Sequence, residues 1–448
     1  MAMRRGRAFP AVLLGLMVIG FTAFAFAGQG VKKKEAGSAV PLGQANLQGA
    51  LQGYCGAALD LNDDGRDELV VGAPYARSGQ YLGALLIYPN PGDGLRGPAE
   101  VLKGDGNLGW SLVALGRQWF AAGAHSGSGE KSSLCGTVSV YQWEDKPVEK
   151  VVLEGENAMD KFGYALAAGD FNADGAIDLA VGAPLHSPDP VLYQQGAVYI
   201  YFGPDYGPDR DVYIPATAAY GGIGFTVAAG DIDGDGIQDL LLGATGRVIA
   251  FYGGPDAFSS LQPDAVFTSR DGGFGRSMAV LGDLDGDGIN DLALGAYQAE
   301  IGAIDSGRLF VVRGAAGQRT VNLDGVPLHA DLLTRIDGDP TCGQFAAAIS
   351  PLGDFDGDSV PDMAVGAVHA DGDPWPMTGA IYLFSGADLA RGATMQDGRA
   401  LIGKSRDMHF GTFLAPVDGG RWLAVGAPTE HANAGRVYVL DLRRGEVQ

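Results

Sequence analysis

Cysteine is scarce in this chain, and basic residues are outnumbered by acidic ones. Only three cysteines, Cys55, Cys135 and Cys342, occur among 448 residues, and three cannot all pair within one chain. The sequence therefore excludes the dense disulfide framework that supports many small secreted domains. Lys and Arg number 31 against 53 Asp and Glu, which gives a net charge of −22. Because such a surface repels phosphate backbones, we expect no nucleic-acid partner.

Motifs for catalysis are also missing. The chain has no Gly-x-Ser-x-Gly elbow, no His-Glu-x-x-His pair and no phosphate-binding loop, the short patterns that mark several common enzyme classes. We therefore expect that the protein is not an enzyme. A hydrolase or lyase that uses paired acids remains an alternative, because such a site needs no sequence signature and a fold alone does not exclude it.

Long apolar runs are absent beyond the first 27 residues. Residues 1–27 combine an arginine-rich start, an apolar stretch and a small-residue cleavage site ending at Ala27, which predicts a secretory signal peptide. An uncleaved membrane anchor is the alternative, because the apolar stretch approaches spanning length. We expect a flexible linker over 28–37 and no membrane span after signal removal. The predicted location is secreted, periplasmic or at the cell surface.

A nine-residue acidic pattern, by contrast, is abundant, and each copy runs directly into a hydrophobic segment. Its clearest copy extends from Asp231 to Asp239. Oxygen side chains at positions 1, 3, 5 and 9, a backbone carbonyl at position 7 and a glycine at position 6 supply the hard ligands and the sharp turn that Ca²⁺ prefers. The last copy has Ser359 at position 6, where we expect a strained backbone or an altered turn.

A solvated turn could explain one isolated copy. Five copies with the same spacing favour metal sites, because turn chemistry alone does not demand oxygen ligands at alternate positions. We therefore predict up to five bound Ca²⁺ ions. The predicted ligands at positions 1, 3, 5, 7 and 9 are Asp60, Asn62, Asp64, Arg66 and Glu68; Asp170, Asn172, Asp174, Ala176 and Asp178; Asp231, Asp233, Asp235, Ile237 and Asp239; Asp283, Asp285, Asp287, Ile289 and Asp291; and Asp354, Asp356, Asp358, Val360 and Asp362.

A Gly-Ala pair recurs once in each of seven repeating units, two of which lack the acidic pattern. The spacing of the pairs is too long and irregular for tight solenoids and suits four-stranded units with variable loops. We predict an all-β fold, a seven-bladed β-propeller of four-stranded blades over residues 38–448. The pairs are Gly72-Ala73, Gly123-Ala124, Gly182-Ala183, Gly243-Ala244, Gly295-Ala296, Gly366-Ala367 and Gly426-Ala427.

This pattern resembles the FG-GAP repeats of the integrin α-subunit N-terminal β-propeller. Phe-Gly elements stand at Phe162-Gly163, Phe274-Gly275 and Phe410-Gly411, and Gly-Ala-Pro elements start at Gly72, Gly182 and Gly426. The resemblance covers about residues 38–442. It implies a seven-bladed propeller with calcium in the loops between first and second strands.

The last unit is too short to complete its own blade, because only eight residues follow Leu440. The segment 39–42 precedes the first inner strand much as 399–402 precedes the last one. We therefore predict that this N-terminal segment pairs with blade 7 and closes the ring, which removes the unpaired edges that the two chain ends would otherwise present.

The face opposite the acidic loops carries the connections between second and third strands. Tyr75, Tyr297 and Trp375 lie in these connections and are candidate ligand contacts. Blade 4 crosses through Thr245 and Gly246 alone, which predicts a notch in this face, unless loop length simply varies. We also expect an insert over 323–341 ahead of blade 6.

All six histidines fall on this same face, so a shared histidine site is one hypothesis and loop polarity is another. They are His125, His186, His329, His369, His409 and His431.

Three hypotheses of function follow. The leading one is an exported, calcium-binding binding or adhesion module that recognises a protein or glycan through the face opposite the calcium sites. The second is a propeller-fold hydrolase or lyase with a site on that face or in the central channel. The third is a structural scaffold.

Overall fold

The structure of the chain is a computed structural model that describes residues 34–35, 40–41, 50–78, 81–93, 97–130, 132–187, 193–207, 210–217, 221–324 and 331–442. All of them belong to one compact unit, Lys32–Gln448. The predicted signal peptide lies outside the described residues and stays a prediction. Within the predicted linker, Lys34–Glu35 form a short strand, β1. No helix in the described part of the chain is long and apolar enough to span a membrane.

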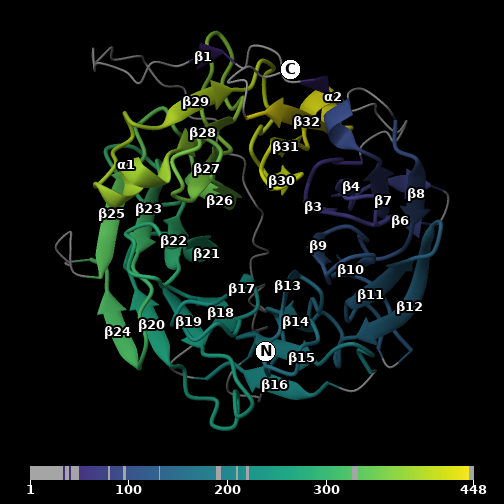
Figure 1. Cartoon of the computed structure of the whole chain (residues 1–448). Coiled ribbons are helices and arrows are strands. Elements are labelled where there is room, and N and C mark those ends of the chain that lie inside the picture. Colours follow the sequence, from purple (N-terminus) through teal and green to yellow (C-terminus); the bar gives the residue numbers. More distant parts are fainter. Residues whose placement is uncertain are drawn as a thin grey trace, which may run out of the picture. The chain divides into compact units, whose positions relative to one another are not determined.

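Seven antiparallel sheets follow one another along the chain and form the blades of a β-propeller (Figure 1). This confirms the predicted fold class. In the residues that the structure describes, helices are limited to short turns at η1 (Pro91–Asp93), α1 (Gly386–Ala390) and α2 (Glu430–Asn433). The strands, from inside to outside, are β3 (Gly56–Leu59), β4 (Glu68–Gly72), β7 (Ala84–Tyr88) and β8 (Glu100–Lys103) in blade 1; β9 (Ser111–Ala114), β10 (Trp119–Ala124), β11 (Thr137–Trp143) and β12 (Pro147–Glu154) in blade 2; β13 (Ala165–Gly169), β14 (Asp178–Ala183), β15 (Ala197–Tyr201) and β16 (Val212–Pro215) in blade 3; β17 (Val227–Gly230), β18 (Asp239–Ala244), β19 (Arg247–Phe251) and β20 (Ala265–Thr268) in blade 4; β21 (Phe274–Gly282), β22 (Asp291–Ala296), β23 (Arg308–Val312) and β25 (Leu332–Asp337) in blade 5; β26 (Phe345–Gly353), β27 (Asp362–Ala367), β28 (Ala380–Phe384) and β29 (Arg399–Ile402) in blade 6; and β30 (Leu414–Val417), β31 (Trp422–Ala427), β32 (Arg436–Asp441) and β2 (Val40–Pro41) in blade 7.

The second strand of each blade is the centre of its packing. Every residue is buried in β4, β14, β18, β22, β27 and β31. Neighbouring blades cover both faces of these strands. The sequences of the strands are therefore continuously apolar and do not alternate between apolar and polar residues. Between blades 3 and 4, for example, Val198 and Ile200 pack in one cluster with Leu240 and Leu242.

The Phe-Gly and Gly-Ala positions meet between neighbouring blades. A Cβ atom on Gly182 would lie 2.2 Å from the carbonyl oxygen of Gly224, and one on Gly243 would lie 2.0 Å from that of Gly275. Gly224 and Gly275 occupy the second Phe-Gly position of the following blade and have φ of +89° and +80°, which glycine adopts without strain. The repeated motif therefore marks a close backbone contact between blades.

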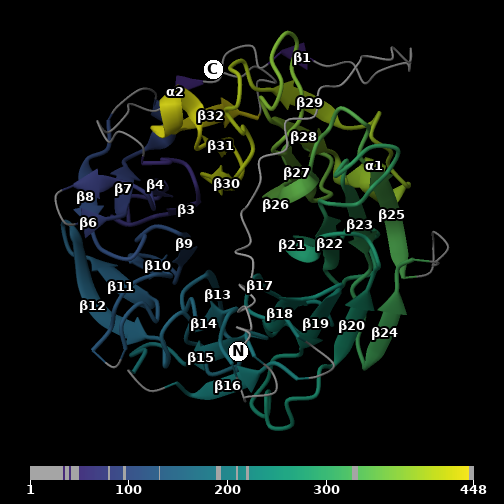
Figure 2. The same ribbon diagram turned by 180° about the vertical axis from the view of Figure 1, so that it is seen from behind.

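The ring closes as predicted. Strand β2 pairs antiparallel with β32, with Val40 opposite Val439. The first strands contact one another in the order β3, β9, β13, β17, β21, β26 and β30, and β30 contacts β3; Figure 2 shows these strands innermost from the other side. A Cβ atom on Gly426 of blade 7 would lie 2.1 Å from the Gly53 carbonyl oxygen, so the closing contact is of the same kind as the others.

The prediction of an insert over 323–341 is wrong, because this segment contributes a strand to blade 5. Its residues Leu332–Asp337 form β25, the outermost strand of blade 5, which pairs antiparallel with β23. The preceding strand β24 (Arg319–Asn322) pairs in parallel with β20 of blade 4. Blade 5 therefore reaches its outer strand only after the chain has crossed to its neighbour, and β1 adds in a similar parallel manner to β29.

Candidate metal centres and the opposite face

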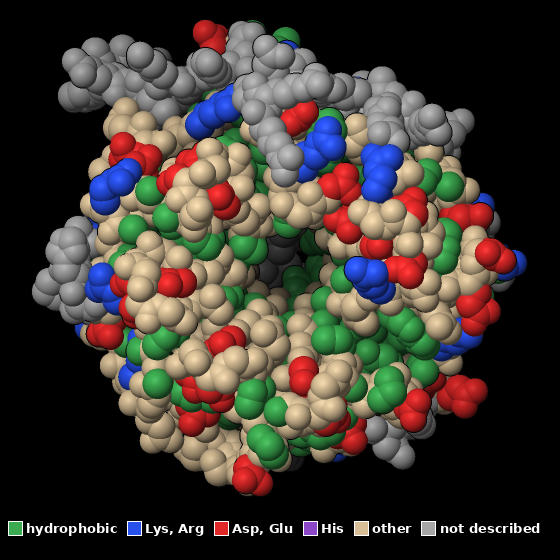
Figure 3. All heavy atoms as spheres, viewed as in Figure 1, with side chains coloured by type: hydrophobic (Ala, Val, Ile, Leu, Met, Phe, Trp, Pro, Cys, Tyr) green, Lys and Arg blue, Asp and Glu red, His purple; other side chains and the backbone are tan. Residues whose placement is uncertain are grey.

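The five acidic segments all form turns between the first and second strands of blades 1, 3, 4, 5 and 6, and we call them acidic loops. Figure 3 shows acidic side chains spread around one face of the described blades, which surround a central opening. In blades 2 and 7 the corresponding connections are the short turns between β9 and β10 and between β30 and β31.

All five loops share one hydrogen-bond pattern. The carboxylate at position 1 accepts the N–H of position 6, and the carboxylate at position 5 accepts the N–H of position 7. In blade 4 these are Gly236 N to Asp231 Oδ2 at 2.9 Å and Ile237 N to Asp235 Oδ1 at 2.8 Å. Ser359 keeps the pattern with its N–H 2.9 Å from Asp354 Oδ2, but it does so at φ +72°, as expected for the strained alternative. The matching contacts at position 6 are Gly65 to Asp60, Gly175 to Asp170 and Gly288 to Asp283.

In blades 3, 4, 5 and 6, the acid at position 9 joins the loop to the end of the third strand. In blade 4, Asp239 is fully buried and accepts the N–H of Ile232 at 2.7 Å and that of Gly253 at 2.8 Å. The same pair of contacts recurs in blades 3, 5 and 6. Sequence reasoning missed this role, although a glycine two residues after each of these third strands was a visible signal. The equivalent acid–glycine pairs are Asp178 with Gly203, Asp291 with Gly314 and Asp362 with Gly386.

Carboxylates converge in three of these loops. In blades 4, 5 and 6, one carboxylate oxygen from each of positions 1, 3 and 9 lies within 4.8 Å of the others, an arrangement that could hold a metal ion. The three groups are Asp231, Asp233 and Asp239; Asp283, Asp285 and Asp291; and Asp354, Asp356 and Asp362. Blades 1 and 3 have an amide at position 3, Asn62 and Asn172, whose oxygen is also a suitable ligand for Ca²⁺.

The electrostatics of the loops fit a bound cation. The pKa of Asp239 is raised to about 7, chiefly by burial; the two backbone hydrogen bonds lower it, and the nearby Asp233 and Asp231 carboxylates raise it. Burial likewise raises the pKa values of Asp178, Asp291 and Asp362 to about 6. A divalent cation would remove this unfavourable charge burial, and the all-oxygen donor set suits a hard ion such as Ca²⁺.

The loops differ in their basic neighbours. In blade 5, the Nε atom of Arg313 lies 2.6 Å from Asp285 Oδ2, so a guanidinium contacts the position-3 carboxylate. In blade 1, Arg117 pairs at 2.6 Å with Asp63, which is not a predicted ligand, and Glu68 replaces Asp at position 9. These contacts distinguish the loops in blades 1 and 5 from the simpler one in blade 4.

The three candidate contacts for a protein or glycan ligand lie at the ends of the strands opposite the acidic loops. Tyr75 and Trp375 are 40% and 47% exposed, and Tyr297 is half-buried. Tyr75 and Tyr297 both contribute to the raised pKa of Tyr164, which burial raises most. Both tyrosines therefore lie close enough to Tyr164 to affect its pKa. Trp375 lies separately, on blade 6.

Sequence reasoning missed an aromatic cluster near the ring axis. Four aromatic residues each follow the glycine at the Phe-Gly position of their blade, which is Gly53, Gly109, Gly163 or Gly224, and lie just before the inner strand. They are Tyr54, Trp110, Tyr164 and Phe225, and we call them the axial aromatic cluster. The ring centroid of Trp110 lies 4.6 Å from that of Tyr54 and 5.2 Å from that of Tyr164, and Tyr164 lies 5.3 Å from Phe225. Arg276, at the same position in blade 5, stacks 3.8 Å over Phe225.

The histidines whose side chains are described fall into separate environments. His186 is buried and contacts Asp160 Oδ2 at 2.8 Å and the Tyr213 hydroxyl at 2.9 Å. His125 lies edge-on to Trp110 at 4.1 Å. The rings of His369 and His409 lie 5.0 Å apart, so the structure brings together one pair. His329 and the side chain of His431 lie outside the described residues.

The two-residue crossing of blade 4 is confirmed, because β18 ends at Ala244 and β19 begins at Arg247. The notch inferred from it stays a prediction.

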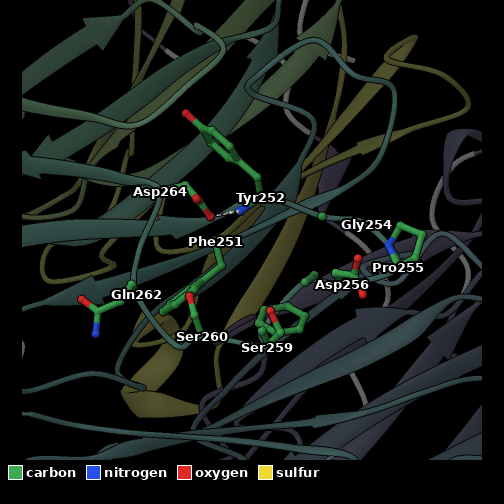
Figure 4. A pocket seen from close by; sticks show the side chains of 12 residues that line it. Phe251, Tyr252, Gly254, Pro255, Asp256, Ser259, Ser260, Gln262 and Asp264 are labelled. Atoms are coloured by element: carbon green, nitrogen blue, oxygen red, sulfur yellow. Dashed lines mark hydrogen bonds between the residues drawn. The ribbon is translucent and has the colours of Figure 1, made fainter.

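A cavity of about 370 Å³ also lies in blade 4, on the acidic-loop side. It is formed by the loop between β19 and β20, where Asp264 accepts the N–H of Tyr252 at 3.0 Å. Figure 4 shows the Tyr252 ring directed away from the side chains of Ser259 and Ser260. The cavity is open to the surface and contains no convergent set of titratable groups.

Comparisons with known proteins agree with this geometry. The FG-GAP repeat matches residues 53–88 and 162–201, and an FG-GAP-like repeat matches residues 231–294. These segments include the acidic loops of blades 1, 3, 4 and 5. The fold and the loops thus define a seven-bladed, FG-GAP-repeat β-propeller.

The relatives include phosphatidylinositol-glycan-specific phospholipases D and integrin α subunits. The chain is 34% identical over 218 residues to phosphatidylinositol-glycan-specific phospholipase D of Homo sapiens, which covers 45% of this chain and 21% of the relative. It is 33% identical over 227 residues to integrin alpha-5 of Xenopus laevis, covering 47% and 20%, and 33% identical over 192 residues to integrin alpha-IIb of Mus musculus, covering 39% and 18%. The chain is therefore homologous to integrin α subunits and spans about a fifth of the length of these relatives.

Proposed function

We propose that this chain is an exported, calcium-binding propeller that acts as a binding or adhesion module and recognises a protein or glycan on the face opposite its acidic loops. The observation that carries the proposal is the division of the molecule into two faces. One face has five acidic loops of matching geometry, and the other has the axial aromatic cluster with exposed tyrosine and tryptophan side chains.

Calcium would be held by the side-chain oxygens at positions 1, 3, 5 and 9 and by the carbonyl at position 7 of each loop. Bound Ca²⁺ supplies positive charge where the carboxylates converge. The residues themselves fix the loop, because Asp231 and Asp235 accept backbone N–H groups within it and Asp239 joins it to Gly253. A preorganised loop of this kind gains affinity, since little ordering remains to be done on binding.

Recognition is proposed to centre on the axial aromatic cluster. Trp110 contacts Tyr54, Tyr164 and His125, so its ring is held in place while remaining half-buried rather than covered. Burial and the nearby Lys161 lower the pKa of His125 to about 4, which keeps its imidazole neutral at physiological pH. Rigid, partly exposed aromatic rings are the side chains that most often dominate binding energy in interfaces.

The experiment is a glycan and surface-protein binding screen of the mature chain, with calcium and with chelator. We expect a ligand whose affinity falls at least tenfold in Trp110→Ala, the size of a typical anchor residue. Tyr193→Ala is the matched control, because Tyr193 is 68% exposed and makes no contact with the cluster that the structure describes. Equal binding by both variants would contradict the proposed face.

An enzyme is the second candidate, and the observation that favours it is the similarity to phosphatidylinositol-glycan-specific phospholipase D. Release of a protein from a phosphatidylinositol-glycan anchor by the purified chain would support it. We expect no release, since the axial aromatic cluster and the neighbouring Arg276 offer aromatic rings and a cation but no carboxylate. A chain that neither binds nor turns over any ligand would leave the scaffold hypothesis.

A further inference from the structure

Blade 6 contains a second cavity on the face opposite the acidic loops. It measures about 390 Å³ and lies between the loop that joins β27 to β28 and the chain that leaves β29. Its lining includes Trp375 and Asp373 from the first segment and Ile402 and Lys404 from the second. That size is at the lower end of the range for small-molecule sites, about 300–1,000 Å³, and suits one or two sugar rings.

Three side chains of this cavity are available for a ligand. Trp375 is 47% exposed, which is unusual for the largest side chain in proteins. Asp373 and Lys404 are exposed, and within the described part of the chain neither is assigned a hydrogen bond or an ion pair. An aromatic face, a free acceptor and a free donor therefore surround one hollow.

The loop that carries Trp375 is fixed by its own hydrogen bonds. Gly372 N–H donates to the Trp375 carbonyl at 2.9 Å, and Met377 N–H donates to Asp371 Oδ1 at 3.0 Å. Asp371 N–H in turn donates to the Thr341 carbonyl at 3.1 Å, which joins the loop to the segment that precedes β26. The exposed indole is thus held on an anchored turn, and such preorganisation lowers the entropic cost of binding.

We propose that this cavity, which we call the blade 6 pocket, binds a pyranose ring of a saccharide. The apolar C–H face of the ring would lie on the Trp375 indole, since an aromatic surface desolvates C–H groups while leaving the hydroxyls at the rim. The carboxylate of Asp373 would accept hydroxyl protons, and the Lys404 ammonium would donate to a hydroxyl or a carboxylate oxygen of the sugar.

The chemistry of the pocket favours a saccharide over other ligands. Lys404 at the rim disfavours a metal ion or a cationic peptide side chain, and the protein's net charge of −22 disfavours a polyanion such as nucleic acid. An extended peptide would pair with a free strand edge, whereas β28, the strand that follows the loop, is paired on both sides by β27 and β29. The inference rests on the proposed function, in that it names one ligand class for the same face.

The test uses the mature chain in calcium and an array of oligosaccharides that end in neutral hexoses or in uronates. Binding constants are then measured by calorimetry. We expect Trp375→Ala to weaken binding at least tenfold, Trp375→Phe to retain a measurable part, and Asp373→Asn to weaken both sugar classes. Lys404→Ala should weaken uronate binding more than hexose binding. Tyr193→Ala is the control for an exposed aromatic elsewhere, and the unfolding temperature of each variant checks folding.

Several outcomes separate this inference from the proposed function. Saccharide binding that survives in Trp375→Ala but is lost in Trp110→Ala would overturn the blade 6 pocket and leave the proposed function intact. Binding of peptides, but of no saccharide at millimolar concentration, would also overturn the pocket. If the wild-type chain binds neither saccharides nor surface proteins, both the pocket and the proposed function fail.

Discussion

Blades 4 and 2 share the same four inner strands but differ in the loop between the first and second strands. Each has four antiparallel strands, to which blade 4 adds the parallel strand β24. In each, the Gly-Ala glycine lies against the next blade: a Cβ on Gly243 would lie 2.0 Å from the Gly275 carbonyl oxygen, and one on Gly123 would lie 2.1 Å from that of Gly163. Blade 4 places an acidic loop between its first two strands, whereas blade 2 has a short turn. The comparison indicates that backbone packing and apolar strands are sufficient to form a blade. The acidic loop is an addition whose carboxylate charge must be neutralised, for example by a bound cation.

The largest expected effect comes from filling the contact that both blades share. A side chain at Gly243 or Gly123 would clash with a backbone oxygen of the next blade, which can move only if the strand shifts. Gly243→Val and Gly123→Val should therefore each destabilise the chain by at least about 3 kcal/mol. Urea unfolding in calcium measures this. Gly97→Ala, where a Cβ meets no atom within 4 Å, should stay within about 0.5 kcal/mol. A much smaller loss of stability in blade 2 than in blade 4 would contradict the claim that both blades depend on this contact.

The second effect concerns Asp239, the acid at position 9 of the acidic loop, which has no counterpart in blade 2. Asp239→Ala leaves the buried N–H of Ile232 and the half-buried N–H of Gly253 without acceptors, which should cost about 2–4 kcal/mol. Unfolding with and without chelator separates the roles of this carboxylate, because the loss of the strand contact should persist after calcium is removed. Asp256→Ala, an exposed acid of the same blade, is the matched control. A loss that vanishes in chelator would limit Asp239 to metal binding.

Calcium removal should act locally. At a calcium concentration of 100 times Kd, each bound ion stabilises its loop by about 2.7 kcal/mol, so chelation should speed amide exchange in the acidic loops by up to about 100-fold. Gly236 and Ile237 in blade 4 should respond, whereas the turn around Gly116 in blade 2 should change much less. Hydrogen–deuterium exchange measures both in one experiment. A uniform response around the ring would show that the ions stabilise the blades as a whole.

The smallest expected effect is at Ser359, which stands at φ +72° where the other acidic loops have glycine. Ser359→Gly should relieve a left-handed backbone and stabilise the calcium-loaded chain by about 1 kcal/mol. Calorimetric unfolding tests this, with Gly357→Ala in the same loop as the reverse change, since Gly357 has φ +89°. If Ser359→Gly is neutral or destabilising, the serine has a role beyond filling the turn.

Local patterns were sufficient to predict the blades, the ring closure and the positions of the acidic loops. The Gly-Ala pairs and the nonapeptide repeat mark structure within a few residues of themselves, so their spacing carries the architecture. The outer strand of blade 5 was not predictable in this way, because β24 first crosses to pair with β20 and this contact joins residues far apart in sequence.

The opposite face was predicted only in outline. Tyr75, Tyr297 and Trp375 lie on it as expected. The axial aromatic cluster was missed because Tyr54, Trp110, Tyr164 and Phe225 differ in type and lie more than 50 residues apart. Their shared position after the Phe-Gly element was the signal that could have identified them. The role of the position-9 acids was missed for a related reason, since the glycines that they contact lie in a different connection.

The most direct test of this account is the calcium stoichiometry of the purified mature chain, measured by titration calorimetry together with equilibrium dialysis. The account predicts about five ions for each chain, and about four for a variant in which Asp231, Asp233 and Asp239 are changed to Asn. An unmodified chain that takes up no Ca²⁺ would contradict it, as would a triple variant that binds as many ions as the original.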